Sequence, residues 1–195
     1  MKRLRFKLNV VPDKSAKYWY DRARQYIEYL AIDKSHVTLL CDLIAATSPR
    51  KQVKNNIILA YKIYHEYVTT GKIVLTGIMG THKKNVIRAC TGQALSGNKV
   101  RAFAENLKGN LQVVTIDMHI IKAYHKSEVN ITDTVYKFLS DKIRSEASDL
   151  GIMPARYQAM VWQASRTKYQ SRQGKKLKVM PVTFDRAITE VINTI

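Results

Sequence analysis

The stretch LSGNKVRAFAENLKGNLQVVTIDMHI, residues 95–120, contains the start of one helical pattern, a break, and the start of another. Apolar residues recur at three- and four-residue spacing over 96–107, which is typical of an amphipathic helix, and the pattern resumes over 117–126. Gly109-Asn110 lies between them and favours a turn. The β-branched run VVTI stops at Asp117, a residue type that caps helix starts well. The stretch therefore predicts two helices joined by a short extended lead-in.

The same spacing extends along the rest of the chain, and strand-like alternation is rare. It predicts further helices over 13–32, 35–47, 51–69, 82–92, 132–149, 153–168 and 183–194. Residues that interrupt helices fall between these segments, at Pro12, Ser48-Pro49, Gly71, Gly77, Gly80, Gly151, Gly174 and Pro181. Ser35 is the expected N-cap of the second helix. We therefore expect an all-α fold with short connections.

One long connection stands out, the segment KYQSRQGKKLKVMP at 168–181. It is polar and basic, and it is longer than most loops in compact domains. Two interpretations are open at this point, a solvated connector and an arm that contacts DNA.

Length and composition indicate a protein that can bury its own core. The chain has 195 residues, of which 46% are apolar, enough for one domain or one domain with two lobes. Cys41 and Cys90 are too few for a disulfide framework or a four-cysteine metal site, so a reducing, cytoplasmic setting is the simplest. The basic amino terminus lacks the apolar run of a signal peptide, and no run of apolar residues is long enough to span a membrane. We expect an intracellular monomer.

The charge favours a polyanionic partner. The chain carries 33 Lys and Arg against 15 Asp and Glu, a formal net charge of +18, and the cations are spread along its whole length. Each phosphate that a cation neutralises releases condensed counterions, so binding to nucleic acid is favoured without regard to sequence. Ribosomal or membrane-surface binding would produce the same charge. Charge and solubility together favour nucleic acid.

Three stretches, in order, resemble the endonuclease III branch of the helix-hairpin-helix (HhH-GPD) DNA glycosylase superfamily. LLCDLIAATSPRKQVKNNIILAYKIYHEY at 39–67 is similar to the buried helix, polar break and following helix of that branch. GIMGTHKKNVIRAC at 77–90 is similar to its glycine, bulky residues, small polar pair and amphipathic helix. The segment 95–120 resembles its hairpin glycine and lysine, a helix, and the signature hydrophobic-Asp-x-His-hydrophobic.

On this resemblance Lys99 falls on the catalytic lysine of the branch and Asp117 on its catalytic aspartate, eighteen residues later, as expected there. The resemblance implies a compact, two-lobed, glycosylase-like fold for the whole chain. One lobe would span about 36–125 and the other about 1–35 plus 126–195.

The chain also departs from the branch. It is shorter between Cys90 and Leu95, so the first hairpin helix is missing or cut back, and Gly97 alone remains of the two hairpin glycines. The carboxy-terminal cysteine cluster is absent, so no iron–sulfur cluster is expected. No other cofactor is expected, and no histidine, cysteine or carboxylate spacing predicts a metal site.

The resemblance implies a DNA glycosylase that excises a damaged or modified base and cuts the strand at the abasic site. Asp117 would stabilise the developing charge on the sugar or take a proton from the nucleophile. Lys99 would attack the anomeric carbon and form a Schiff base. Without the resemblance, Asp117 is simply a helix cap and Lys99 one of many surface lysines.

Further candidates follow from the same comparison. Residues expected at the base pocket are Thr47, Ser48, Gln52, Met79 and His119. Residues expected to contact double-stranded DNA are Gly97, Asn98, Arg101, Arg50, Lys51, Arg166, Lys168, Arg172, Lys175 and Lys176. For the first group, helix capping, turn formation and core packing are the alternatives.

Two other functions fit the same residues. A phage enzyme of this fold could build a hypermodified base, displacing a leaving group from an activated thymine derivative. A DNA-binding module without catalysis would use Lys99 to contact phosphate and Asp117 only as a cap. The trimmed hairpin suits a viral or mobile-element protein, and nothing in the residues names the base.

Overall fold

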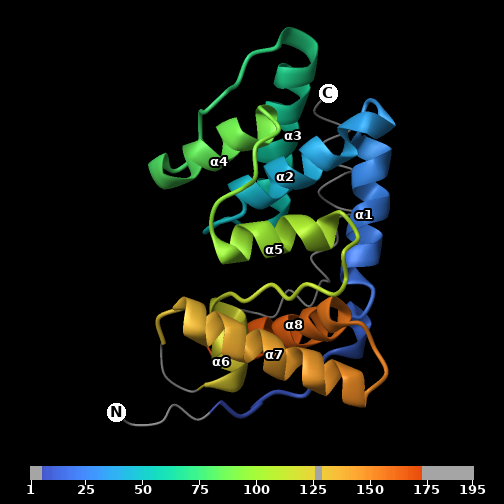
Figure 1. Ribbon diagram of the computed structural model, residues 1–195, viewed down its shortest axis with the longest axis vertical. Helices are drawn as coiled ribbons and strands as arrows, with labels where there is room; N and C mark the ends of the chain where they lie inside the picture. Colours follow the sequence, from blue (N-terminus) through green and yellow to red (C-terminus); the bar gives the residue numbers. More distant parts are fainter. Residues whose placement is uncertain (1–5, 126–128, 173–195) are drawn as a thin grey trace. The chain divides into compact units, whose positions relative to one another are not determined.

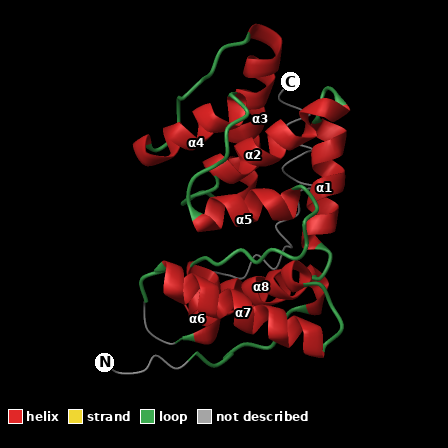
Figure 2. Ribbon diagram, in the orientation of Figure 1, coloured by secondary structure: helices red, strands yellow, loops and turns green. Residues whose placement is uncertain are grey.

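The computed structural model describes residues 6–125 and 129–172. Over these residues the protein contains helices and no strands, which confirms the all-α prediction (Figures 1 and 2). The helices are η1 (Lys14–Ala16), α1 (Trp19–Leu30), η2 (Lys34–His36), α2 (Val37–Thr47), α3 (Val53–Thr70), α4 (Gly80–Cys90), α5 (Asn98–Leu107), α6 (Met118–Tyr124), α7 (Asp133–Asp149) and α8 (Pro154–Arg172). The helix expected over 183–194 lies outside the described residues.

The chain divides into two compact units. Unit 1 contains residues 6–20 and the described residues from Asn110 onward, and unit 2 contains residues 21–109. The break between the units therefore falls after Gly109, whereas the expected lobe ended at about 125. As a consequence Asp117 belongs to the same unit as α7 and α8, and Lys99 belongs to the other unit.

Unit 2 is built around α2. The sequence of this helix, VTLLCDLIAAT, is apolar on nearly every side, and its buried residues include Leu40, Leu43 and Ile44. A helix that is apolar all round must be covered all round. Helices α3, α4 and α5 all pack against α2 and cover it.

Unit 1 packs α6, α7 and α8 around a core that includes Ile116, Ile120 and Tyr157. The extended segment 6–10 closes this core. Phe6, Leu8 and Val10 pack against it at every second position. This alternation is what an extended backbone requires, because successive side chains point to opposite sides.

The residues between these side chains cap the end of α6. The backbone N–H of Lys7 donates to the Tyr124 carbonyl at 2.9 Å, and the N–H of Asn9 donates to the Ala123 carbonyl at 2.8 Å. The Asn9 side chain donates to the carbonyl of Lys122 at 3.1 Å. Three of the last carbonyls of α6, which its own helix cannot satisfy, thus find donors in the first residues of the chain.

Two details differ from the sequence prediction. Ser35 is not the N-cap of α2: it lies inside η2, and its N–H donates to Asp33 Oδ1 at 2.7 Å. The hydroxyl of Ser35 also donates to this carboxylate and is held within η2, and α2 begins at Val37 without a side-chain cap.

The loop expected over 168–181 is wrong in its first part, because α8 continues to Arg172. Contacts within unit 1 hold this extra turn. Lys168 Nζ donates to the carbonyl of Asn9 at 2.6 Å, and Lys122 Nζ lies 3.8 Å from the centre of the Tyr169 ring. Residues 173–181 lie outside the described residues.

Candidate active site and nucleic-acid interface

Asp117 is the N-cap of α6, as the sequence predicts. Its Oδ1 accepts from the backbone N–H of His119 at 2.8 Å and of Ile120 at 3.1 Å. Its Oδ2 accepts from Trp162 Nε1 at 2.9 Å. The first two bonds satisfy amides that the helix leaves without partners, and the third fixes the plane of the carboxylate. Both oxygens are therefore oriented, while the residue keeps part of its surface exposed.

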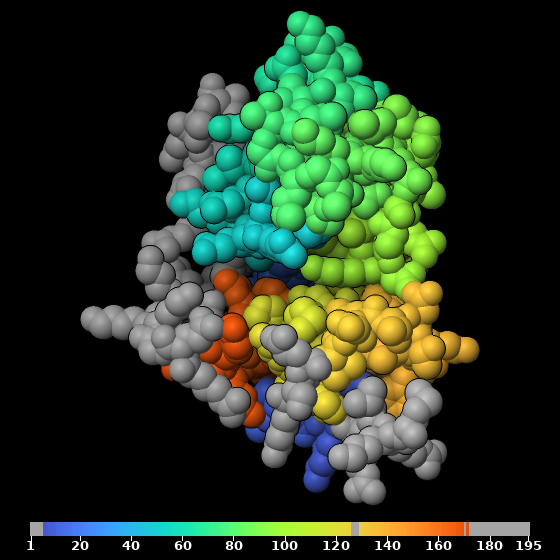
Figure 3. Space-filling model, turned by 90° about the vertical axis from the view of Figure 1, so that its left-hand side faces the viewer, coloured from blue at the N-terminus to red at the C-terminus, as the bar shows by residue number. Residues whose placement is uncertain are grey.

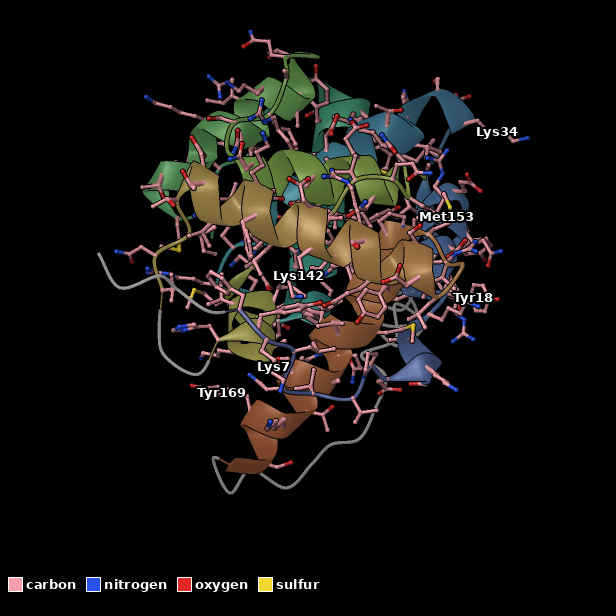
Figure 4. All side chains as sticks on the ribbon, turned by 60° about the horizontal axis from the view of Figure 1, so that its bottom comes forward. Lys7, Tyr18, Lys34, Lys142, Met153 and Tyr169 are labelled. Atoms are coloured by element: carbon pink, nitrogen blue, oxygen red, sulfur yellow. The ribbon has the colours of Figure 1, made fainter. Side chains whose placement is uncertain are left out.

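Trp162, which donates to this carboxylate, belongs to a row of rings. Its ring centre lies 5.7 Å from that of His119 and 6.4 Å from that of Trp19. Tyr169, near the end of α8 (Figure 4), lies 6.2 Å from His119. Edge-to-face and tilted pairs at these distances are favourable. The indole that holds the acid is thus part of an aromatic row from α1, α6 and α8.

A guanidinium and a hydroxyl of α8 lie near Trp162 and the start of α6. The Arg166 guanidinium lies 5.3 Å from the centre of the Trp162 ring, and burial lowers the pKa of this arginine. The Ser165 hydroxyl donates to the carbonyl of His119 at 2.7 Å, which ties α8 to the first turn of α6. Tyr20 is also close: burial raises its pKa, and the charge of Asp117 adds to this effect.

Lys99 lies in the first turn of α5, in unit 2, and is half-buried. The helix starts at Gly97, whose φ of +90° is a conformation that glycine adopts at little cost. No side chain caps the first amides of α5. The connection from α4 to α5, residues 91–97, contains no helix.

Asn85 fixes the end of this connection. Its Nδ2 donates to the carbonyl of Ser96 at 3.0 Å, and its Oδ1 accepts from the N–H of the same residue at 2.8 Å. Asn85 is itself buried. The pair of bonds ties the start of α5 to the middle of α4.

The pocket candidates are divided between the two units. Thr47 is buried, and its hydroxyl lies 2.8 Å from the carbonyl of Leu43 and 2.7 Å from Asn56 Oδ1, so it joins α2 to α3. The Ser48 hydroxyl donates to the carbonyl of Ala45 at 2.9 Å at the end of α2. These two hydroxyls have structural partners in unit 2. Their role in a base pocket stays a prediction.

The other pocket candidates are more exposed to solvent than Thr47. Gln52 and Met79 occupy the N-cap positions of α3 and α4 and are both exposed, without a capping side-chain bond. His119 belongs to unit 1, beside Trp162.

The residues expected to bind DNA also differ in their surroundings. Arg50 is exposed and has a φ of +59°, which is uncommon for a residue other than glycine. Lys51 is half-buried. Arg101 is exposed and donates to Asn98 Oδ1 at 2.8 Å. Arg166 is held over a tryptophan ring rather than extended into solvent.

Four basic candidates remain, two near the end of the described residues and two beyond it. Lys168 is exposed but donates to Asn9. Arg172 is the last residue of α8, and Lys175 and Lys176 lie outside the described residues.

The sequence analysis did not identify Trp162 as the partner of Asp117. The signal available was its helical spacing with Ser165, Arg166 and Tyr169, which places these side chains along adjacent faces of one helix. Nothing in the sequence showed that α6 would lie against this part of α8. The contact between α6 and α8 is a property of the fold.

A second polar cluster occupies the core of unit 1. Glu146 Oε2 accepts from the hydroxyls of Tyr124 and Tyr157, the latter at 3.0 Å, and its Oε1 lies 3.0 Å from Lys142 Nζ. Burial raises the pKa of Tyr157 to about 12, and the charge of Glu146 contributes in the same direction. The half-buried carboxylate thus has three partners at the edge of this core.

The cysteines are both free and buried. Burial raises the pKa of the Cys41 thiol to about 12 and that of Cys90 to about 11. Among the residues that the structure describes, no three His, Cys, Asp or Glu side chains gather as they would around a metal ion. Over the same residues, no helix combines the length and apolar character needed to cross a membrane.

These features define an all-α protein of two helical units, with an oriented carboxylate at the start of a short helix in one of them. Residues 12–169 match the family of unknown function DUF7178, and the chain belongs to that family. No curated protein and no solved structure shows significant similarity to the chain.

Proposed function

We propose that the protein is a DNA glycosylase that removes a damaged or modified base from double-stranded DNA, with associated abasic-site lyase activity. The observation that carries the proposal is the carboxylate of Asp117, which is oriented by two amides and by Trp162 at the start of α6. Its place in the segment that resembles the endonuclease III branch, eighteen residues after Lys99, supports the assignment.

The chemistry needs the target base to leave the DNA stack, which costs a few kcal/mol and is easiest at a damaged or weakly paired position. The sugar then develops positive charge as the bond to the base breaks. A carboxylate held in advance stabilises this charge without reorganising at the moment of reaction. Asp117 fits this role because three hydrogen bonds already fix its position.

Lys99 supplies the second group. Its amine attacks the anomeric carbon, the base leaves with the electrons of its glycosidic bond, and a Schiff base forms as the sugar ring opens. β-Elimination of the 3′ phosphate then cuts the strand. A protein that used Asp117 alone would activate water and leave an intact abasic site.

The surroundings of Asp117 also support a base-excision role. Trp162 holds the acid, and the rings of His119 and Tyr169 continue the row from it; aromatic side chains are well suited to stack with an extruded base. The formal net charge of +18 supports the affinity for DNA. In this proposal the protein acts as an intracellular monomer, in the cytoplasm of a cell or of a viral host.

The test is incubation with duplexes that carry a panel of damaged and phage-type modified bases, with and without alkali and with borohydride. Abasic sites alone indicate a monofunctional glycosylase, whereas nicks and trapped adducts indicate the lyase. Lys99→Gln should abolish the trapped adduct, while Lys62→Gln, an exposed lysine of α3 in the same unit, should not. An adduct that persists in Lys99→Gln would exclude the Schiff-base role.

Asp117→Asn should reduce base release on any substrate that the wild-type protein cleaves. Unchanged release by this variant would exclude the role of the acid. A base that changes mass without leaving the DNA would instead favour the transferase that builds a hypermodified base. DNA binding that falls with salt, without any product, would favour the non-catalytic module.

A further inference from the structure

Unit 2 contains a long stretch without acidic residues. Between Glu66 and Glu105 the sequence has no Asp or Glu, while 67–104 carries six Lys and Arg. The cations are Lys72, Lys83, Lys84, Arg88, Lys99 and Arg101. Half of them lie on α4, and the last two lie in the first turn of α5. Such a stretch concentrates positive charge in one part of the fold instead of spreading it over the surface.

The cations of α4 stand on its free face. Asn85, Val86, Ala89 and Cys90 are buried, and α4 packs against α2. The other face carries Lys83 and Lys84, which are exposed, and Arg88, which is half-buried one turn after Lys84. Figure 3 shows α4, in green, on the surface that faces the viewer.

The described residues provide no ion-pair partner for these three cations. The ion pairs of unit 2 involve other residues: Arg24 pairs with Glu28 at 2.5 Å, and Lys108 pairs with Asp42 at 2.8 Å and Glu105 at 3.5 Å. These carboxylates of α1, α2 and α5 therefore pair with Arg24 and Lys108. Among the described residues, no carboxylate forms an ion pair with Lys83, Lys84 or Arg88.

The start of α5 extends the same surface. The two bonds between Asn85 and Ser96 hold the end of the connection against the middle of α4. Lys99 and Arg101 follow within the next five residues, beside the amides that no side chain caps. Cations at the start of a helix are what phosphate oxygens bind.

The packing of α4 distinguishes between two possible anionic partners, a membrane surface and nucleic acid. A helix that binds a membrane surface inserts an apolar face into the lipid. In α4 the apolar face is already packed within unit 2, and Ile87, at 40% exposure, is the one large apolar side chain of this helix that is exposed. The free face is cationic, which suits contacts with a charged backbone and not insertion into lipid.

We propose that the free face of α4, with Lys83, Lys84 and Arg88, and the start of α5 form a surface that binds the phosphate backbone of nucleic acid. These three residues extend the DNA contacts assigned to the start of α5. The inference rests on the proposed function only in taking nucleic acid as the partner, since it requires no base release.

The experiment measures binding to a short, unmodified, fluorescently labelled DNA duplex by anisotropy over a range of salt concentrations. The double variant Lys83→Gln/Lys84→Gln removes two charges from the surface. Arg22→Gln/Lys34→Gln removes two exposed charges from α1 and η2 of the same unit and serves as the matched control; Lys34 is labelled in Figure 4. All four side chains are exposed to solvent, so the fold should persist, which far-UV circular dichroism checks.

The double variant of α4 should lower the slope of log K against log salt by about 1.8, because each phosphate that the protein no longer neutralises reduces the slope by about 0.9. Binding should weaken about ten- to hundred-fold. The control should keep the wild-type slope. An unchanged slope in the α4 variant, or an equal weakening in the two variants, would overturn the proposal.

A further arm separates this inference from a membrane partner. Vesicles of phosphatidylserine and phosphatidylcholine test the membrane: if the α4 variant lost vesicle binding but kept its affinity for DNA, the surface would belong to a membrane partner and the proposal would be wrong. Because the duplex is unmodified and only binding is measured, a slope that falls in the α4 variant and not in the control supports the surface even if no substrate for base release is found.

Discussion

The hydrogen bond from Trp162 Nε1 to Asp117 Oδ2, 2.9 Å long, leads to a specific prediction for Asp117→Asn. Asparagine is as good an N-cap as aspartate, so its oxygen should keep the two amides of α6. Its NH₂ group then takes the place of Oδ2, opposite the indole N–H. Two donors would face each other where a donor and an acceptor now meet.

The magnitude follows from these contacts. A half-buried donor left without an acceptor costs about 1–3 kcal/mol. Loss of the negative charge at the start of the helix adds about 0.3–1 kcal/mol. We therefore expect Asp117→Asn to lower the free energy of unfolding by about 2 kcal/mol, which corresponds to a fall in Tm of about 4–8 °C for a chain of this size.

Trp162→Phe removes the indole donor, so the same Asp117→Asn change should then cost only the charge contribution, about 0.5 kcal/mol. The coupling energy between the two positions should be about 1–2 kcal/mol. Urea unfolding followed by far-UV circular dichroism measures all four proteins without relying on tryptophan fluorescence. Trp19→Phe, at the neighbouring ring 6.4 Å from Trp162, is the control and should show additive effects with Asp117→Asn.

Additivity between Asp117→Asn and Trp162→Phe, within about 0.5 kcal/mol, would refute the reasoning. It would mean that the indole does not orient the carboxylate in solution. The pre-organisation of Asp117 would then rest on the helix amides alone.

Three other predictions concern the rest of the molecule. Asn85→Ala should lower the free energy of unfolding by about 1–3 kcal/mol, because it leaves the backbone of Ser96 without partners, and hydrogen exchange should show faster exchange of the Ser96 amide; unchanged protection would contradict the structure. Cys41, whose thiol pKa burial raises to about 12, should resist a thiol reagent near neutral pH in the folded protein and react in urea, so rapid native labelling would be the contrary result. Unfolded tyrosine ionises near pH 10, whereas burial raises the pKa of Tyr157 to about 12, so its contribution to stability is complete below pH 10 and is lost as the pH rises toward 12. Urea unfolding across this range should show the fall, and Tyr157→Phe should make it shallower; an equally steep fall in that variant would assign it to other groups.

Local patterns in the sequence predict the helices of the fold better than the contacts between them. The periodic apolar spacing predicted the helices at α2, α3, α5, α7 and α8 because each buries one face or, for α2, nearly all of its surface. The cap at Asp117 could also be predicted, because its partners are only two and three residues away in the sequence. The prediction that Ser35 caps α2 was wrong, because the Ser35 hydroxyl donates to Asp33 instead.

Contacts between distant segments were beyond such patterns. The bond from Trp162 to Asp117 spans 45 residues, and that from Asn9 to Ala123 joins the first residues of the chain to the end of α6. Neither segment carries a local signature of its partner. The extended segment 6–10 is also too short for its alternation to predict what it would pair with.

The order of the units along the chain has a consequence for folding. The described part of unit 2 is one continuous segment, 21–109, inserted into unit 1, whose segment 6–10 must meet α6 across more than a hundred residues. Within unit 2, Arg24 Nη1 donates to the carbonyl of Lys108 at 2.6 Å, so the two ends of the insert are bound to each other. Once unit 2 has folded, the chain between segment 6–10 and α6 is effectively much shorter, and closing it costs less entropy. Synthesis from the amino terminus also makes segment 21–109 before α6 emerges. The end of α6 is thus expected to be capped late, by residues 7 and 9, which are made before it.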